Sequence, residues 1–321
     1  MNNDHVVLVA DCDHPDIDIE KRVLADVCRE LPWLNCRSED EVIAQCADAE
    51  GLIIMYAPLT RRVMQHLKRC KIIARYGVGV DTIDLRAAAE LGIVASNVPD
   101  YGTEEVSDHA LAMMLCLTRK IAQANAYVKQ GQWDFRLMQP IFRHQVQTIG
   151  IIGIGRIGSA MARKVRALGM RVLAFDPYIT DPARAPEGVT LVSLETLLRE
   201  SDVVSVHCPL NDETRNLLDE ARLGLMKPTA YLVNTARGNI VNEVALEKML
   251  AEKRLAGAAL DVLASEPGRV DHPLFKYDNF LCSPHMAWHS SESAQELKRK
   301  AAEEVRRVLR GEAPWYQVNK F

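Results

Sequence analysis

Three polar side chains of complementary chemistry follow short apolar runs in the C-terminal half of the chain: Arg237, Glu266 and His285. A guanidinium binds a carboxylate through two parallel hydrogen bonds, and an imidazole exchanges a proton near neutral pH. A carboxylate beside that imidazole favours its charged form. Hydride transfer at a hydroxyl-bearing carbon needs such an anion clamp, proton carrier and orienting acid. The residue types therefore predict this reaction class. The alternatives are a surface salt bridge for Arg237 and a solvated loop acid for Glu266.

The loops that hold these residues begin where predicted strands end. Arg237 lies in the segment 234–238, Glu266 in 261–267 and His285 in 283–288. Ligands of doubly wound sheets bind outside the carboxyl ends of the strands, so all three loops are expected to face a cofactor. We expect Thr235 and Ala236 to lie beside that cofactor. Asp261 is expected to contact it or to brace the site.

A glycine-rich turn stands between a predicted strand and a predicted helix. Its sequence is Gly153-Ile-Gly155-Arg156-Ile157-Gly158. The first glycine makes the tight turn, the second lets the backbone approach a diphosphate, and the third lets the helix pack on the strand. The free N–H groups at the helix start favour an anion. The spacing predicts a dinucleotide site, with a ligand-free βαβ unit as the alternative.

An acid ends the next predicted strand. Asp176 stands 18 residues beyond Gly158, where it can accept hydrogen bonds from the 2′-hydroxyl of an adenosine ribose. Its negative charge would repel a 2′-phosphate. The sequence therefore predicts NAD rather than NADP.

The length and composition are those of an ordinary soluble globular protein of about two domains. The chain has 321 residues and a net charge of −4, which favours neither nucleic acid nor an anionic membrane. No apolar run approaches a membrane span, and the N-terminus shows no basic leader. The 8 cysteines form no CxxC pair, so we expect reduced thiols, a cytoplasmic location and no metal.

Apolar runs alternate with helical patterns, which predicts parallel α/β architecture. Residues 104–129 contain no proline or glycine and are expected to form one long helix. The predicted strands are 6–10, 52–55, 71–75, 93–95, 148–152, 171–175, 203–206, 230–233, 257–260 and 280–282. The predicted helices are 18–31, 60–69, 83–91, 156–168, 193–200, 219–224, 242–252 and 292–309.

A second glycine-containing loop lies in the N-terminal part. It reads Arg75-Tyr76-Gly77-Val78-Gly79 and follows a predicted strand. Its glycines let backbone N–H groups converge on an anion, as in a small nest. A purely structural turn is the alternative.

In this order and spacing, the motifs resemble the D-isomer-specific 2-hydroxyacid dehydrogenases from about Gly51 to Gly311. Besides the loops already described, the matching segments are Gly77-Val-Gly79-Val-Asp81, Asn97-Val-Pro99, Glu104-Glu-Val-Ser-Asp-His109 and His207-Cys-Pro209.

The resemblance implies a flavodoxin-like, discontinuous substrate domain (1–99 and 285–321) around an inserted Rossmann NAD-binding domain (100–284). It implies Arg237 as carboxylate clamp, His285 as general acid/base and Glu266 as its partner. It also implies homodimers built on the NAD-binding domains. Further positions beside the cofactor are His207, Pro209 and Thr214.

One branch is more similar than the rest. Ser283-Pro-His-Met-Ala-Trp-His-Ser290 and Asp176-Pro-Tyr178 look like the C-terminal-binding-protein branch. In that branch a tryptophan placed like Trp288 lines the substrate pocket, and an arginine placed like Arg75 contacts the substrate. Some members are corepressors that sense the dinucleotide, but Val78 replaces a serine often found in them.

The leading hypothesis is therefore an NAD-dependent enzyme that interconverts a D-2-hydroxy acid and a 2-oxo acid. A dinucleotide-sensing protein with little turnover is the alternative. D-3-phosphoglycerate is a disfavoured substrate, because Met55 stands where the enzymes for that substrate place an arginine.

Overall fold

The computed structural model describes residues 4–179 and 181–320, and its contacts divide the chain into two compact units. Unit 1 comprises Met1–Gly102 with Ser290–Phe321, and unit 2 comprises Thr103–His289. Each unit contains one parallel sheet, which confirms the predicted α/β class with two Rossmann-like sheets. The unit boundaries lie a few residues beyond the predicted ones. The turn that carries His285 consequently belongs to unit 2.

Unit 1 has a four-stranded parallel sheet in the order β1-β2-β3-β4. An isolated parallel bridge joins Val9 to Trp33 on the free side of β1. Counting this short extended segment second gives the flavodoxin-like order 2-1-3-4-5. The strands are β1 (Val7–Val9), β2 (Gly51–Ile54), β3 (Ile72–Arg75) and β4 (Val94–Ser96).

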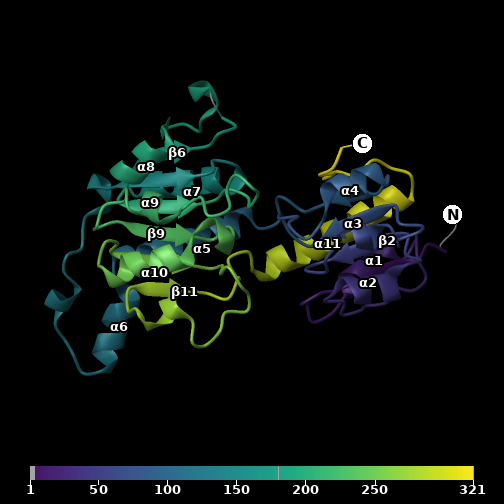
Figure 1. Cartoon of the computed structure of the whole chain (residues 1–321), viewed down its shortest axis with the longest axis horizontal. Coiled ribbons are helices and arrows are strands. Elements are labelled where there is room, and N and C mark those ends of the chain that lie inside the picture. The colour runs from purple at the N-terminus through teal and green to yellow at the C-terminus, as the bar shows by residue number, and fades with distance from the viewer. Residues whose placement is uncertain (1–3, 180, 321) are drawn as a thin grey trace. The chain divides into compact units, whose positions relative to one another are not determined.

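Helices from both ends of the chain cover this sheet. The last helix, drawn in yellow in Figure 1, lies beside the purple and blue N-terminal elements and packs on α1, β2 and β3. Its apolar face is buried and its other face is charged, which is typical of a helix lying on a core. The helices of unit 1 are α1 (Asp18–Leu24), α2 (Glu39–Cys46), α3 (Arg61–Met64), α4 (Leu85–Glu90) and α11 (Ser291–Leu309).

Unit 2 has a seven-stranded parallel sheet in the order β11-β10-β9-β8-β5-β6-β7. The strand order reverses at β5, so the loop after β5 lies at the switch point where such sheets bind ligands. The strands are β5 (Thr148–Ile152), β6 (Arg171–Phe175), β7 (Val189–Leu191), β8 (Val203–Val206), β9 (Tyr231–Asn234), β10 (Gly257–Leu260) and β11 (Phe280–Cys282).

Two apolar clusters lie against this sheet. One joins the sheet to α8, α9 and α10, and the other joins it to α5 and α7. The central strands β5, β8, β9 and β10 are buried throughout, as expected where helices cover both faces of a parallel sheet. The helices of unit 2 are α5 (Thr103–Thr118), α6 (Ile121–Lys129), α7 (Arg156–Ala167), α8 (Leu194–Glu200), α9 (Glu220–Leu223) and α10 (Glu243–Ala251).

The prediction of one helix over 104–129 is wrong. The helix ends at Thr118, and α6 starts after Lys120, which has the left-handed φ of +53°. The Thr118 hydroxyl donates to the Met114 carbonyl oxygen and also lies 3.0 Å from His144 Nε2. This tertiary contact occurs at the break, where the sequence has neither glycine nor proline.

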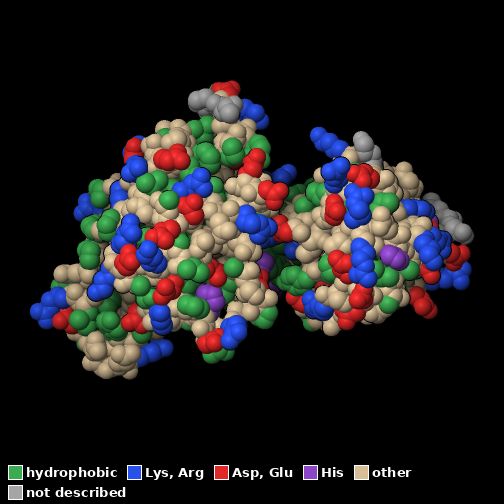
Figure 2. Space-filling model, viewed as in Figure 1, with side chains coloured by type: hydrophobic (Ala, Val, Ile, Leu, Met, Phe, Trp, Pro, Cys, Tyr) green, Lys and Arg blue, Asp and Glu red, His purple; other side chains and the backbone are tan. Residues whose placement is uncertain are grey.

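On the face drawn in Figure 2, acidic and basic side chains are interspersed, without a patch of one sign. Among the described residues, no helix is both long and apolar enough to cross a membrane.

Candidate active site

In the glycine turn between β5 and α7, backbone contacts require glycine at two positions, and the third glycine borders open space. Gly153 has a φ of +88°, and a Cβ there would lie 2.7 Å from the backbone nitrogen of Cys208. A Cβ on Gly158 would collide with the carbonyl oxygen of Gly153, because the helix packs directly on the turn. A Cβ on Gly155 would meet no described atom within 4 Å. Gly155 therefore borders open space at the start of the helix.

The amino end of α7 has donors available for an anion. The hydrogen bond that starts the helix runs from the Ser159 N–H to the Gly155 carbonyl oxygen, at 2.9 Å. Within residues 4–179 and 181–320, the N–H groups of Arg156 and Ile157 donate to no protein acceptor. The first turn also contains no acidic residue. The open space at Gly155 and these free donors fit the diphosphate of NAD.

Asp176 lies at the end of β6 and is already oriented by the backbone. Its Oδ2 accepts from the Ile154 N–H and its Oδ1 accepts from the Tyr178 N–H, both at 3.0 Å. Each carboxylate oxygen keeps a further lone pair. Asp176 therefore remains able to accept hydrogen bonds from ribose hydroxyls.

The loops after β8 and β9 supply a neutral imidazole and an unpaired hydroxyl. Burial lowers the pKa of His207 to about 4, and its Nε2 lies 2.8 Å from Ser205 Oγ. His207 is therefore neutral at pH 7 and is not a proton donor there. The Thr235 hydroxyl is buried and has no hydrogen-bond partner among the described residues, which suits a ligand group. Thr214 donates to the Pro209 carbonyl oxygen at 2.6 Å and closes its loop.

His285 and Glu266 form a hydrogen-bonded pair. The distance from His285 Nδ1 to Glu266 Oε2 is 2.7 Å, and both side chains are about one-third exposed. Burial raises the pKa of Glu266. That pKa is nevertheless held below its ordinary value, because Glu266 accepts hydrogen bonds from His285 and from the Leu263 N–H. The positive charges of His285 and Arg237 lower it further. Glu266 therefore stays ionised at neutral pH and orients the imidazole.

Arg237 stands on a turn that is fixed from both sides. The buried Asn234 side chain accepts from the Ala236 N–H at 3.0 Å and donates to the Arg237 carbonyl oxygen at 2.9 Å. A Cβ on Gly238 would collide with the Leu263 backbone, which belongs to the loop of Glu266. The glycine therefore allows the loops of Arg237 and Glu266 to pack directly against each other.

Asp261 is buried beneath the turn that carries His285. Its carboxylate oxygens accept from the backbone N–H groups of Met286 and Ala287, at 3.0 and 2.9 Å. Its carbonyl oxygen accepts from the His285 N–H at 2.8 Å. These contacts correspond to the expected bracing role, and the cofactor contact stays a prediction. Trp288 is half-buried at the end of the same turn.

The loop after β3 in unit 1 also has backbone N–H groups without an acceptor among the described residues. The Gly77 carbonyl oxygen accepts from the Val98 N–H at 3.0 Å, and the Val78 carbonyl oxygen accepts from the Asn97 amide at 2.6 Å. Within the described residues, the N–H groups of Val78 and Gly79 have no protein acceptor. A Cβ on Gly77 would collide with the Arg75 guanidinium, so that side chain lies over the loop. This arrangement suits an anion.

Tyr76 lies in the core of unit 1. Its side chain is 1% exposed, and its hydroxyl donates to Glu20 Oε1 at 2.6 Å. The phenol is therefore not presented at the surface of the loop. The predicted contact between Tyr76 and a substrate has no support from this placement.

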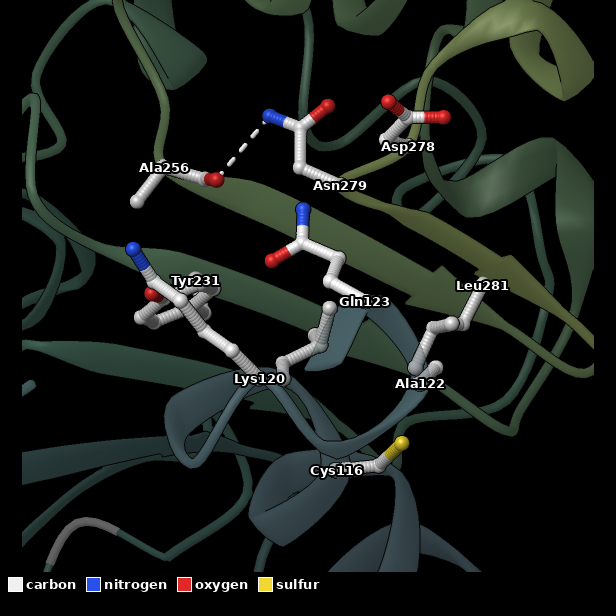
Figure 3. Close-up of a pocket in the computed structure, with 10 residues that line it drawn as sticks. Cys116, Lys120, Ala122, Gln123, Tyr231, Ala256, Asp278, Asn279 and Leu281 are labelled. Atoms are coloured by element: carbon white, nitrogen blue, oxygen red, sulfur yellow. Dashed lines mark hydrogen bonds between the residues drawn. The ribbon is translucent and has the colours of Figure 1, made fainter. Parts of the chain in front are cut away.

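A separate hollow lies between α6 and the strands β9 to β11 (Figure 3). Lys120, Gln123 and Tyr231 line it, and Asn279 at its rim donates to the Ala256 carbonyl oxygen at 2.9 Å. None of the predicted site residues lines this hollow. Among the described residues, no group of three His, Cys, Asp or Glu side chains is arranged to hold a metal.

Two polar residues that support the site were not predicted as site residues. Asn234 ends β9 and holds the Arg237 turn, and Ser283 donates to Asp261. Asn234 is the last residue of β9 and Ser283 directly follows β11. The carboxyl end of a strand is the position where polar side chains of such sheets meet a ligand. This position was the signal available in the sequence.

Comparison with known proteins identifies the family. The model for the D-isomer specific 2-hydroxyacid dehydrogenase NAD binding domain matches residues 111–287. Glyoxylate reductase of Korarchaeum cryptofilum is 38% identical over 287 residues, which cover 88% of this chain and 86% of that protein. D-3-phosphoglycerate dehydrogenase of Methanocaldococcus jannaschii is 35% identical over 315 residues, which cover 98% of this chain but 59% of that protein.

A solved structure agrees with these relatives. D-lactate dehydrogenase of Aquifex aeolicus, complexed with NAD and lactic acid, is 29% identical with a TM-score of 0.87. The superposition covers 95% of this chain and 96% of that one. The domain match and the identity to glyoxylate reductase together show that the chain belongs to the D-isomer-specific 2-hydroxyacid dehydrogenases, a family of NAD-dependent oxidoreductases.

Proposed function

We propose that this protein reduces a 2-oxo acid to the D-2-hydroxy acid with NADH. The observation that carries the proposal is the 2.7 Å pair between His285 and Glu266, in the same unit as Arg237 and a glycine turn that fits NAD. The relatives named for glyoxylate, D-lactate and D-3-phosphoglycerate define the substrates to test first.

Arg237, His285 and Glu266 have different proposed roles, which follow from the charge of each side chain. The glycine turn and Asp176 would hold NADH, which would supply the hydride for the carbonyl carbon. Arg237 holds the substrate carboxylate by two hydrogen bonds and favours negative charge near the carbonyl. The protonated His285 gives its Nε2 proton to the carbonyl oxygen and becomes neutral. Glu266 holds Nδ1 and stabilises the charged imidazole before the transfer.

The test is a set of kinetic assays of NADH oxidation with glyoxylate and pyruvate, and of NAD reduction with D-3-phosphoglycerate. His285→Ala is expected to lower kcat by roughly 10²–10⁴-fold, because the proton donor is lost. Binding of NADH, measured by its fluorescence, should change little. The control is His66→Ala, which alters an exposed histidine of unit 1. An unchanged kcat in His285→Ala would remove His285 from the mechanism.

The rival function is a sensor that binds NADH tightly and turns over little, as in the C-terminal-binding-protein branch. The branch itself stays a prediction. Catalysis is favoured by the presence of all three side chains, Arg237, Glu266 and His285. A protein that only senses the dinucleotide does not need a histidine that is held by an acid and can carry a proton. Tight NADH binding without oxidation by any 2-oxo acid would favour the sensor.

The loop of unit 1 is proposed to bind a carboxylate through the N–H groups of Val78 and Gly79 and the Arg75 side chain. The support is local: two N–H donors without an acceptor among the described residues and one cation at the same turn. Gly79→Pro removes one of the two donors. It should raise KM for the oxo acid several-fold while the Kd for NADH stays constant.

A homodimer through unit 2 is also part of the proposal. Several large apolar side chains in and after α6 are exposed, which is typical of a surface that pairs with another chain. They are Ile121, Val128, Trp133, Phe135, Leu137, Phe142 and Val146. Light scattering should give twice the mass of the chain, and the double variant Trp133→Lys with Phe135→Lys should give a monomer. The proposed cytoplasmic location is tested by cell fractionation.

A further inference from the structure

We propose that His109 is a positioning residue for the acid/base histidine and acts through the Ser283 hydroxyl and the Asp261 carboxylate. The inference rests on the proposed role of His285. His109 lies on α5, far in sequence from the three loops of the candidate site. Its Nε2 is 2.9 Å from Ser283 Oγ and 3.7 Å from Asp261 Oδ1.

The direction of this hydrogen-bond chain follows from which groups can donate. A carboxylate only accepts, so the Ser283 hydroxyl must donate its proton to Asp261 Oδ1. That hydroxyl then has lone pairs left for Nε2 of His109, so Nε2 must carry a proton and donate it. The contacts therefore fix the order His109 to Ser283 to Asp261, and they fix the tautomer of a neutral His109.

The Asp261 carboxylate connects this hydrogen-bond chain to the backbone of the turn that carries His285. Its carboxylate also accepts from the N–H groups of Met286 and Ala287, the two residues after His285. The side chain of Asp261 is 1% exposed, so its orientation depends on these donors rather than on water. Removing the Ser283 donor, or the group that orients it, frees the carboxylate to rotate and loosens the N–H groups that it holds.

His285 itself needs such support. Its φ is +52°, a left-handed conformation that is strained for a residue with a Cβ. Such a conformation persists only where the surrounding contacts impose it. Here the contacts are the backbone bonds from His285 to Asp261 and Ser283, at 2.8 and 3.0 Å. Both acceptors belong to the residues that the His109 side chain orients.

The proposal predicts a kinetic defect larger than the loss of stability. His109→Leu should lower kcat roughly 10- to 100-fold, because small misplacements of a catalytic group cost that much. The Kd for NADH should stay within two-fold. His109→Gln should recover most of the rate, since its amide nitrogen can donate to Ser283. The matched control is His66→Leu, an exposed histidine on unit 1.

A double-mutant cycle tests the route of the effect. Ser283→Ala should lower kcat about as much as His109→Leu, and the double variant should be no worse than either single one. Additive losses, or a kcat of His109→Leu within two-fold of the unaltered protein, would overturn the proposal.

Amide hydrogen exchange distinguishes this inference from the proposed function, because it needs no turnover. The N–H groups of Met286 and Ala287 should exchange at least ten-fold faster in His109→Leu and in Ser283→Ala. Faster exchange in a protein that reduces no oxo acid would leave the positioning role standing while the proposed activity fails. Unchanged exchange would overturn the positioning role whatever the activity.

Discussion

A deeply buried acid lies beneath a loop with a proposed function in each unit, and these two acids, Asp261 and Glu20, are satisfied differently. Asp261 in unit 2 lies under the His285 turn and accepts from one hydroxyl and two backbone N–H groups. Glu20 in unit 1 lies under the Gly77 loop and accepts at Oε1 from the Tyr76 hydroxyl. Its Oε2 has no hydrogen-bond partner among the described residues, and the Nζ of Lys298 is 3.8 Å away.

The difference has an electrostatic consequence. Burial raises the pKa of Glu20. The hydrogen bond from Tyr76, a hydrogen bond from the backbone of Glu20 itself and the charge of Lys298 do not fully offset this rise. Lys298 directs its hydrogen bonds to Asp16, at 2.7 and 2.8 Å, rather than to Glu20. A buried carboxylate surrounded by donors can thus hold a turn firmly, whereas one with fewer donors is better satisfied when it carries a proton.

The largest expected effect is at the better satisfied acid. In Asp261→Asn, an amide NH₂ replaces one of the carboxylate oxygens that accept hydrogen bonds in the unaltered protein, so donor faces donor. The variant should be destabilised by roughly 2–4 kcal/mol and should lose most activity. Chemical denaturation measures the free energy of unfolding. The matched control is Asp278→Asn, an exposed residue of the same unit, which should change it by less than about 0.5 kcal/mol. Equal effects would show that the donors around Asp261 contribute little.

A smaller effect is expected from removing the side-chain donor to Glu20. Tyr76→Phe leaves the second oxygen of a buried acid without a partner, which costs roughly 1–3 kcal/mol. The Tm should fall while the Kd for NADH, a ligand of unit 2, stays constant. The exposed Tyr178→Phe serves as the control. A Tm unchanged by Tyr76→Phe would mean that Glu20 is protonated and satisfied by other means.

The smallest effect is a change in pH dependence. The folded-state pKa of Glu20 lies above its unfolded value of about 4.5, so its contribution to stability is fully present below pH 4.5 and is lost as pH rises through the folded pKa. Glu20→Gln removes this loss. The change in the free energy of unfolding from pH 5 to pH 8 should therefore be more positive in the variant than in the unaltered protein. The exposed Glu292→Gln is the control, and an identical pH dependence would contradict the raised pKa.

Local patterns in the sequence were enough for most elements of both sheets. The strands 148–152, 171–175 and 203–206 have the predicted bounds, because buried parallel strands are short apolar runs flanked by turn residues. Helix α2 was missed although Ser38 and Glu41 form a capping box, a signal that the sequence does contain. Strand β7 was missed too, since it is three residues long and only partly buried.

Sequence position also identified the chemistry of Arg237, Glu266 and His285, because each follows a strand end and has a side chain of the required type. The hydrogen bond between His285 and Glu266 spans 19 residues, so its existence depends on how two loops pack. Tyr76 illustrates the opposite outcome: its neighbours in sequence suggested a substrate contact, but its side chain is buried against Glu20.

What the sequence by itself determined was the succession of elements, the dinucleotide turn and the residue types of the candidate site. These depend on interactions within a few residues or on one apolar face. Tertiary structure alone decided the helix break at Lys120 and the network of His109, Ser283 and Asp261, whose first two members are 174 residues apart. Hydrogen bonds between distant segments form only after packing brings donors and acceptors together, and no local pattern records which pairs will meet.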